Sequence, residues 1–246
     1  MKPFLVLLLP LVLVGCGAEP DASQAEAVAA IKKLRGRVTL DKTSGEVVGV
    51  YLGSTPITDA GLEHLKGLAS LTTLYLYRTQ VTDAGLEHLK ELTSLTSLYL
   101  YYTKITDAGL VHLKGLASLT KLNLNGTKIT DAGLEHLQGM TSLEDLNLDF
   151  TEITDAGLVH LQGMTSLTVL HLYKTQITDA GLEHLKGLAS LTMLDLGGTK
   201  ITDARLEHLK GLTSLTILGL GTQITDAGLA EIKAALPKCR IHRLSF

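Results

Sequence analysis

The chain has 246 residues, of which 45% are hydrophobic and 19% are charged, as in ordinary globular proteins of one or two domains. Its formal net charge is −3, and it contains no long run of Lys or Arg. Because binding to a phosphate backbone requires a clustered basic face, this charge pattern excludes nucleic acid as an expected partner.

An export signal is predicted at the amino terminus. Lys2 precedes an apolar run from Phe4 to Val14, which is shorter than the roughly 20 residues that a membrane-spanning helix needs. A short apolar run behind a positive charge is typical of a cleavable signal peptide, which here covers residues 1–15. We therefore expect the protein to be exported.

The apolar run ends in Leu13-Val14-Gly15-Cys16, which resembles the lipobox of bacterial lipoproteins. The resemblance implies acylation of Cys16, which becomes the first mature residue, and a short membrane tether over residues 16–22. Gly17 in place of Asp favours the outer membrane, by resemblance to the proteobacterial sorting rule. The alternative is an ordinary secretory signal with a chance cysteine. If Cys16 is acylated, Cys239 is the one remaining thiol and no disulfide is possible.

An amino-terminal cap is expected over residues 23–56. Residues 23–35 predict an amphipathic helix, because apolar residues recur at helical spacing. Its apolar face carries Val28, Ile31 and Leu34. Residues 38–52 predict a β-hairpin that turns at Lys42-Thr43-Ser44-Gly45. Together the helix and the hairpin would cover the first repeat.

Residues 57–223 consist of seven copies of one repeat with a period of 24, the last copy being one residue short. Internal periods of this size predict a solenoid, in which each repeat contacts its neighbours. A Thr-Asp-Ala triplet recurs eight times, with its aspartates at Asp59, Asp83, Asp107, Asp131, Asp155, Asp179, Asp203 and Asp226. Residues 224–246 are a degenerate copy and are expected to cap the solenoid, with Cys239 and Ile241 buried.

Each copy divides into a strand and a short helix. The segment LxxLxLxxT alternates apolar and polar residues as a half-buried strand does. The segment TDAGLEHLKG predicts a helix with Thr58 or Asp59 as its N-cap and Gly67 in a left-handed conformation at its end. A helix of this length is not stable alone, so it must pack on its neighbours. The shared core would contain Ile57, Leu62, Leu65, Leu68, Leu71, Leu74 and Leu76 in the first copy.

The pattern LxxLxLxxTxITDAGLxxL resembles the leucine-rich-repeat superfamily, in the TDAGL variety of bacterial repeat proteins and F-box receptors. This resemblance implies an α/β solenoid with a parallel sheet on the concave face and short helices on the convex face. A ubiquitin-ligase role is not expected, because the residues before Ile57 leave no room for an F-box and the export signal contradicts it. Thr replaces the usual Asn or Cys after the strand from Thr55 to Thr222, so a threonine ladder to the adjoining coil is expected.

Two recurring polar rows have residue types that can bind metal ions. The aspartates could form a calcium ladder, but each begins a helix, where the dipole and N–H groups favour a carboxylate, so we interpret them as caps. A row of histidines could bind metal or sense pH. Since one file of helix residues does not converge as metal ligands do, we expect these at the solvent edge. They are His64, His88, His112, His136, His160, His184 and His208. No metal and no cofactor is predicted.

The strand positions, unlike the helix positions, vary from copy to copy and hold all seven tyrosines. Tyrosine is enriched in binding hot spots, which favours a binding face; the alternative is cross-strand pairing that only stabilises the sheet. The predicted binding residues are Tyr51, Tyr75, Tyr77, Arg78, Tyr99, Tyr101, Tyr102, Asn123, Asn125, Asp145, Asn147, Asp149, Phe150, His171 and Tyr173.

The sequence therefore predicts a non-enzymatic protein-binding module that is tethered to the cell envelope. An acid–base pair of His171 with Asp149 or Asp195 is conceivable, but no nucleophile stands beside it and an open sheet does not exclude water. Two alternatives stay open. Tyr beside Asn and Asp would also suit a glycan, and a purely structural envelope component would bind no specific ligand.

Overall fold

The computed structural model describes residues 22–244. The predicted signal peptide and the proposed acylation site, Cys16, lie outside the described residues. Within residues 22–244, no helix has the length and apolar character that crossing a membrane requires.

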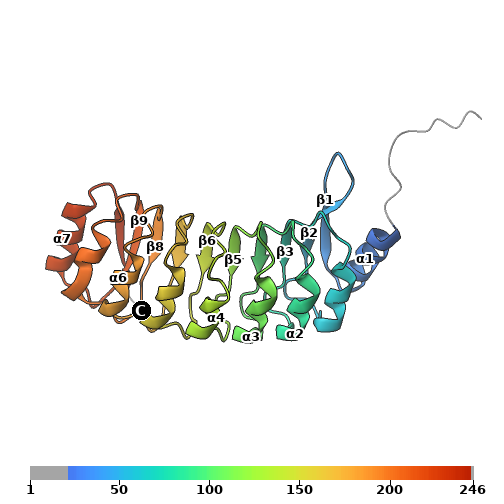
Figure 1. Ribbon diagram of the computed structural model, residues 1–246, viewed down its shortest axis with the longest axis horizontal. Coiled ribbons are helices and arrows are strands. Elements are labelled where there is room, and N and C mark those ends of the chain that lie inside the picture. The colour runs from blue at the N-terminus through green and yellow to red at the C-terminus, as the bar shows by residue number, and fades with distance from the viewer. Residues whose placement is uncertain (1–21, 245–246) are drawn as a thin grey trace, which may run out of the picture.

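The chain forms a curved solenoid around one ten-stranded sheet, in which the strands follow one another in sequence order (Figure 1). β1 (Arg37–Leu40) runs antiparallel to β2 (Val47–Tyr51), and every later strand is parallel to its neighbour. The later strands are β3 (Thr73–Tyr75), β4 (Ser97–Tyr99), β5 (Lys121–Asn123), β6 (Asp145–Asn147), β7 (Val169–His171), β8 (Met193–Asp195), β9 (Ile217–Gly221) and β10 (Arg240–Leu244). This confirms the predicted α/β solenoid.

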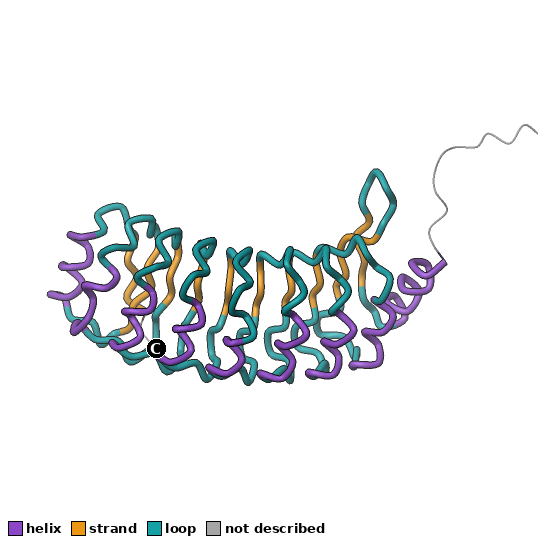
Figure 2. The backbone as a smooth tube through the Cα atoms, in the orientation of Figure 1, coloured by secondary structure: helices purple, strands orange, loops and turns teal. Residues whose placement is uncertain are grey.

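The helices lie along the side of the solenoid opposite the sheet (Figure 2). Longer helices stand at the two ends, α1 (Ala22–Lys33) and α7 (Asp226–Ala235). Between them each coil has only short α or 3-10 segments, the latter marked η. These are η1 (Asp59–Leu65), α2 (Asp83–Leu86), η2 (Glu87–Leu89), α3 (Asp107–Leu110), η3 (Val111–Leu113), α4 (Asp131–Glu135), α5 (Asp155–Leu158), η4 (Val159–Leu161), η5 (Asp179–Gly181), α6 (Leu182–Leu185) and η6 (Asp203–Leu209).

One continuous apolar core runs between the sheet and the helices. In the first coil all seven aliphatic residues predicted for the core are at most 3% exposed, and the equivalent residues of later coils are buried with them. Because each coil closes its core only against its neighbours, stacking supplies the stability that a single short helix lacks. Gly67 has φ +89, which confirms the left-handed conformation predicted for the end of the first helix.

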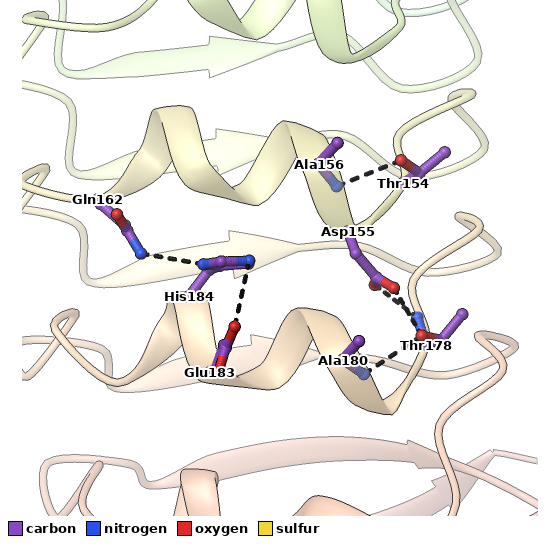
Figure 3. A network of polar contacts seen from close by, with 8 residues as sticks. All are labelled: Thr154, Asp155, Ala156, Gln162, Thr178, Ala180, Glu183 and His184. Atoms are coloured by element: carbon purple, nitrogen blue, oxygen red, sulfur yellow. Dashed lines mark hydrogen bonds and ion pairs between the residues drawn. The ribbon is translucent and has the colours of Figure 1, made fainter.

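Neighbouring coils are joined by a contact that we call the Asp–Thr clasp (Figure 3). Asp155 accepts hydrogen bonds from the backbone N–H of Thr178 at 2.8 Å and from its hydroxyl at 2.6 Å, one coil further on. The Thr178 hydroxyl in turn accepts from the N–H of Ala180 and is the N-cap of η5. The prediction that the aspartates cap their own helices is therefore wrong. Each begins a helix, but the carboxylates of the seven aspartates from Asp59 to Asp203 bind the next coil, and that of Asp226 binds Arg243.

A glycine completes six of the seven clasps. A Cβ at Gly181 would overlap Oδ1 of Asp155, and the same holds for the equivalent glycines and the preceding aspartates. Arg205 occupies this position in η6, and there the backbone leaves helical geometry, with φ −143 and ψ 26. The Thr-Asp-Ala-Gly motif is thus a device for joining coils, since the small residue makes room for the carboxylate.

The predicted ladder, in which the threonines after the strand bond the adjoining coil, is wrong. The hydroxyl of Thr103 donates to the carbonyl of Leu100 at 2.6 Å, within its own coil, and the equivalent threonines from Thr55 to Thr199 do the same. A ladder between coils does exist at a different position. The hydroxyl of Thr72 donates to the carbonyl of Val48 at 2.9 Å, and Thr96 donates to Thr72 at 3.1 Å.

The two ends have the elements that close the sheet. At the amino end, α1 buries Ala27 and Ile31, while Val28 and Leu34 are only half-buried. At the other end, β10 adds a parallel strand beside β9, which the sequence did not predict. Cys239 is buried at 7% exposure, as expected, whereas Ile241 is half-buried rather than buried.

Candidate binding face

The exposed side of the sheet, which we call the strand face, carries the variable residues in register. Tyr51 pairs with Tyr75, Tyr75 with Tyr99, and Tyr99 with Asn123. The same column continues through Asn147, His171, Asp195 and Gly219. Because the strands are parallel and in register, equivalent positions of successive coils become direct neighbours.

Three adjacent strands, β2 to β4, with the residues just after β3 and β4, hold five stacked tyrosines, which we call the tyrosine stack. Tyr75 lies between Tyr51, at 4.8 Å between ring centroids, and Tyr99, at 4.3 Å, with interplanar angles of 12° and 2°. Beside it, Tyr77 stacks on Tyr101 at 4.5 Å. Offset and stacked pairs of this kind stabilise a sheet by about 0.5–1.5 kcal/mol each beyond area burial.

The stacking leaves little ring face open to a ligand. Both faces of Tyr75 are covered by neighbouring rings. One face of Tyr77 is covered by Tyr101, and the other lies against Gly53, where a Cβ would overlap the ring. The edges and hydroxyls of these two rings are therefore the parts of them that a ligand can reach. Burial, with the neighbouring tyrosines, raises the pKa of Tyr75 and of Tyr101, so these hydroxyls stay neutral hydrogen-bonding groups.

A second feature of the face is a residue with left-handed backbone conformation three positions after the end of the strand in most coils. Tyr102 has φ +55 and Phe150 has φ +56, while Gly126 and Gly198 occupy the same position in other coils. The remaining left-handed residues of this column are Ser54, Arg78 and Lys174. A left-handed conformation costs a residue other than glycine about 1 kcal/mol, so bulky side chains at this position are held at some cost to stability.

The side chains of these left-handed residues place aromatic and cationic groups together at the edge of the face. The Arg78 guanidinium lies 5.4 Å from the Tyr102 ring centroid. Phe150 contacts Tyr173 edge to face at 5.3 Å, and the Lys174 ammonium lies 5.5 Å from the Phe150 centroid. Tyr102 is 47% exposed and Phe150 is 45% exposed. They are therefore large apolar side chains that are presented to solvent.

Between these aromatic groups lies a polar cluster of predicted site residues. The amide oxygen of Asn123 accepts from the N–H of Asn125 at 3.1 Å, and Asn147 accepts from Asp149 in the same way at 3.0 Å. Asp149 itself accepts from the N–H of Tyr173 at 2.7 Å. The side-chain oxygen of Asn125 is buried and has no hydrogen-bond partner among residues 22–244.

The charge of Asp149 is disfavoured by its surroundings. Burial raises its pKa, and the nearby Asp195 acts in the same direction, whereas the N–H of Tyr173 and the neighbouring His171 act in the opposite direction. A cationic or donor group from a ligand would relieve this cost. The cluster therefore suits a ligand that brings hydrogen-bond donors.

One predicted site residue lies apart and one further contact was missed. Asp145 stands in the adjacent column, paired with Lys121 and Val169, and is not part of the polar cluster. Arg37 lies with its guanidinium 5.6 Å from the Tyr51 centroid, opposite it in the β1–β2 hairpin. Arg37 lies outside the repeats, so the comparison of copies could not find it.

The histidine row does not form a site. Of the seven, only His64 is exposed and the others are half-buried, so the expected position at the solvent edge holds for one alone. His184 contacts Gln162 of the preceding coil at 3.0 Å (Figure 3). Across residues 22–244, no three or more His, Cys, Asp or Glu side chains are placed to hold a metal ion.

Comparisons with known proteins agree on the repeat. A family model described as leucine rich repeat matches residues 93–153, 117–177 and 165–222, which together span more than half of the chain. A comparison with curated proteins finds no match.

Two solved structures are similar over most of the chain. Internalin C2 from Listeria monocytogenes aligns with a TM-score of 0.68 and 27% identity, over 92% of this chain and 94% of that chain. The ectodomain of the Arabidopsis receptor kinase HAESA, in complex with an IDA peptide hormone, aligns with a TM-score of 0.66 and 19% identity. The alignment covers 91% of this chain and 42% of the HAESA chain, and its low identity shows a shared fold alone.

Proposed function

Since the chain belongs to the leucine-rich-repeat family, we propose that it is a non-enzymatic module that binds a protein partner on its strand face. A fold of this kind serves many roles, so the function must be argued from the surface. One observation carries the proposal. Tyr102 and Phe150, two large exposed aromatic residues, are held in left-handed conformations where other coils have glycine.

A strained exposed residue suggests function more strongly than a buried one. Glycine, as at Gly126 and Gly198, adopts this conformation without strain. The strain at Tyr102 and Phe150 therefore has no evident benefit for the solenoid. Exposed tyrosine and phenylalanine beside Arg78 and Lys174 are the side chains that carry binding energy in protein interfaces. The polar cluster around Asn125 and Asp149 would supply the specific hydrogen bonds between these anchors.

The geometry of the tyrosine stack favours a protein over a glycan. Sugar recognition by aromatic residues uses the open face of a ring, and the faces of Tyr75 and Tyr77 are covered. Ring edges and hydroxyls suit backbone and side-chain groups of a polypeptide. The HAESA ectodomain is solved with a peptide hormone, and a polypeptide is the same class of ligand as the one proposed here.

The proposed location is the cell envelope. The export signal and the lipobox-like segment would place an acylated Cys16 a few residues before α1, which starts at Ala22. The solenoid would then stand close to the membrane that holds its lipid. Replacing Cys16→Ser should release the protein from membrane fractions and stop lipoprotein processing. Unchanged processing and membrane association would refute the lipid anchor. That result would not affect the proposal that the strand face binds a partner.

The binding proposal is tested by removing the two anchors without removing the stack. Tyr102→Gly and Phe150→Gly place at these positions the residue that other coils use, so folding is retained. Each should weaken capture of an envelope protein roughly 30-fold, the loss typical of a hot-spot residue. Ser54→Gly, at φ +57, is the matched control and should change nothing. Equal capture by all variants would refute the proposal, and saturable binding on a glycan array would favour the rival.

A further inference from the structure

A groove of about 750 Å³ lies at the amino-terminal end of the solenoid, away from the strand face. We call it the N-terminal groove. Its walls come from three elements, α1, the β1–β2 hairpin and the turn at residues 67–70. Figure 1 shows the hairpin loop standing away from the body of the solenoid. The volume lies within the roughly 300–1,000 Å³ of small-molecule sites.

The side chains that line the groove are largely apolar. Val28 comes from α1, Val38 and Leu40 come from β1, and Leu68 comes from the turn of the first coil. Leu40 is 49% exposed, the highest value among the large exposed hydrophobic residues that the structure describes. An apolar ligand that covered Leu40 would remove this surface from water, which is favourable in proportion to the area buried.

Except for Lys32, the polar side chains of the walls already have hydrogen-bond partners within the protein. The Gln24 amide accepts from the N–H of Val47 at 2.7 Å and donates to the carbonyl of Gly45 at 3.2 Å. The Ser70 hydroxyl donates to Glu46 at 2.7 Å. A sugar or a polar peptide would have to break these bonds to find partners, at the cost of leaving polar groups unsatisfied. The walls therefore favour an apolar chain.

The rim adds a positive charge. Lys32 lines the groove from the last turn of α1 and is exposed, and its ammonium group has no ion pair or hydrogen bond within residues 22–244. The surrounding cap is basic although the whole chain has a net charge of −3. Between residues 22 and 46 the cations are Lys32, Lys33, Arg35, Arg37 and Lys42, and the anions are Glu26, Asp41 and Glu46. The acidic group in the lining, Glu46, belongs to the hairpin wall and is bonded to Ser70.

We propose that the N-terminal groove binds a single-chain anionic amphiphile, with its acyl chain against Val28, Val38, Leu40 and Leu68 and its anionic head beside Lys32. This site is independent of partner binding on the strand face. A fatty acid and an anionic lysophospholipid share this chemistry, and their binding is distinguished from binding to a membrane surface by the experiment that follows.

The test measures displacement of a fluorescent fatty acid from the purified full chain by palmitate below its micelle concentration. Wild-type protein should bind one molecule saturably, and each methylene added between octanoate and palmitate should tighten binding up to about fourfold. Palmitoyl-lysophosphatidylglycerol should compete like palmitate. Binding only to phosphatidylglycerol vesicles, or affinity that does not depend on chain length, would overturn the proposal.

Two pairs of variants locate the site. Leu40→Asp should weaken palmitate binding about tenfold or more, as expected for one lost leucine contact. Its control is Val111→Asp, which changes a residue of similar exposure, 44%, in η3. Lys32→Glu should weaken binding about threefold, whereas Lys33→Glu, the next residue of α1 and not part of the lining, should not. Circular dichroism should show unchanged folding in all four, and equal losses in variants and controls would overturn the proposal.

Discussion

The Asp–Thr clasp predicts that replacing Gly181 by alanine lowers the stability of the wild-type chain but does not lower it when Asp155 has been removed. Gly181 has φ −67 and ψ −24, a helical conformation that alanine adopts readily. Alanine there would ordinarily stabilise the chain by about 1 kcal/mol relative to glycine. In this protein its Cβ would overlap Oδ1 of Asp155 and lie 3.1 Å from Cγ. If the segment keeps its helical geometry, unlike the backbone at Arg205, the carboxylate must move off Thr178.

The magnitude follows from the two bonds that would be lost. Hydrogen bonds to a charged group contribute about 1.5–3 kcal/mol each, and the half-buried position favours the lower end, about 3 kcal/mol for both. Gly181→Ala should therefore destabilise the wild-type chain by about 2 kcal/mol after the helix preference is subtracted. In an Asp155→Ala background no carboxylate remains, and the same change should be neutral or stabilising by up to about 1 kcal/mol.

The assay is a double-mutant cycle by urea unfolding, followed by circular dichroism. Wild type, the two single variants and the double variant should give a coupling free energy of about 3 kcal/mol. Gly187→Ala is the control, because no atom lies within 4 Å of its added Cβ, and it should not destabilise the chain. If Gly181→Ala costs the same in both backgrounds, or nothing in either, the clasp does not join the coils as described.

Three further predictions concern single side chains. Thr103→Val removes the bond to Leu100 and should lower Tm by about 2–4 °C, for a loss of about 1 kcal/mol, whereas Thr222→Val, at an exposed equivalent position, should not. Tyr75→Ala removes two stacked pairs and should cost about 1–3 kcal/mol, while Tyr75→Phe should keep most of it. Asp149→Asn should raise Tm at pH 7 and have little effect at pH 3.

The sign of the Asp149 prediction follows from its raised pKa. Burial favours the protonated carboxyl in the folded state, so its contribution to stability is fully present below the unfolded pKa of about 3.9. That contribution is lost as the pH rises through the folded pKa. Asparagine keeps an oxygen to accept from the N–H of Tyr173 without the buried charge. A lower Tm for the variant at neutral pH would show that the charge is favourable in this position.

The core of the solenoid could be predicted because the same spacing of apolar residues recurs in every coil. Leu74 and Leu76 alternate with residues that face solvent, and this pattern recurs every 24 residues. Stacking the copies into one sheet buries these leucines. The clasp could not be predicted in this way, because the partner of Asp155 lies 23 residues away and its distance depends on how coils stack. The recurring glycine beside each aspartate was the available signal.

The strand face was also only partly predictable. Alternation places Tyr75 and Tyr77 on the same exposed side, but the orientation of their rings depends on the packing against neighbouring tyrosines and against Gly53. The left-handed conformation of Tyr102 was not predicted, although Gly126 in the same column indicated it. Backbone strain at an exposed aromatic residue appears only once the dihedral angles are known.

The central claim, that the strand face meets a protein partner, is tested most directly by site-specific photocrosslinking. A benzophenone amino acid is placed at Tyr102 on the strand face or at Val111 on the helix side, residues with similar exposures of 47% and 44%. In intact envelopes the account predicts one discrete protein adduct from position 102 and none from position 111. Equal adducts from both positions, or none from position 102, would contradict it.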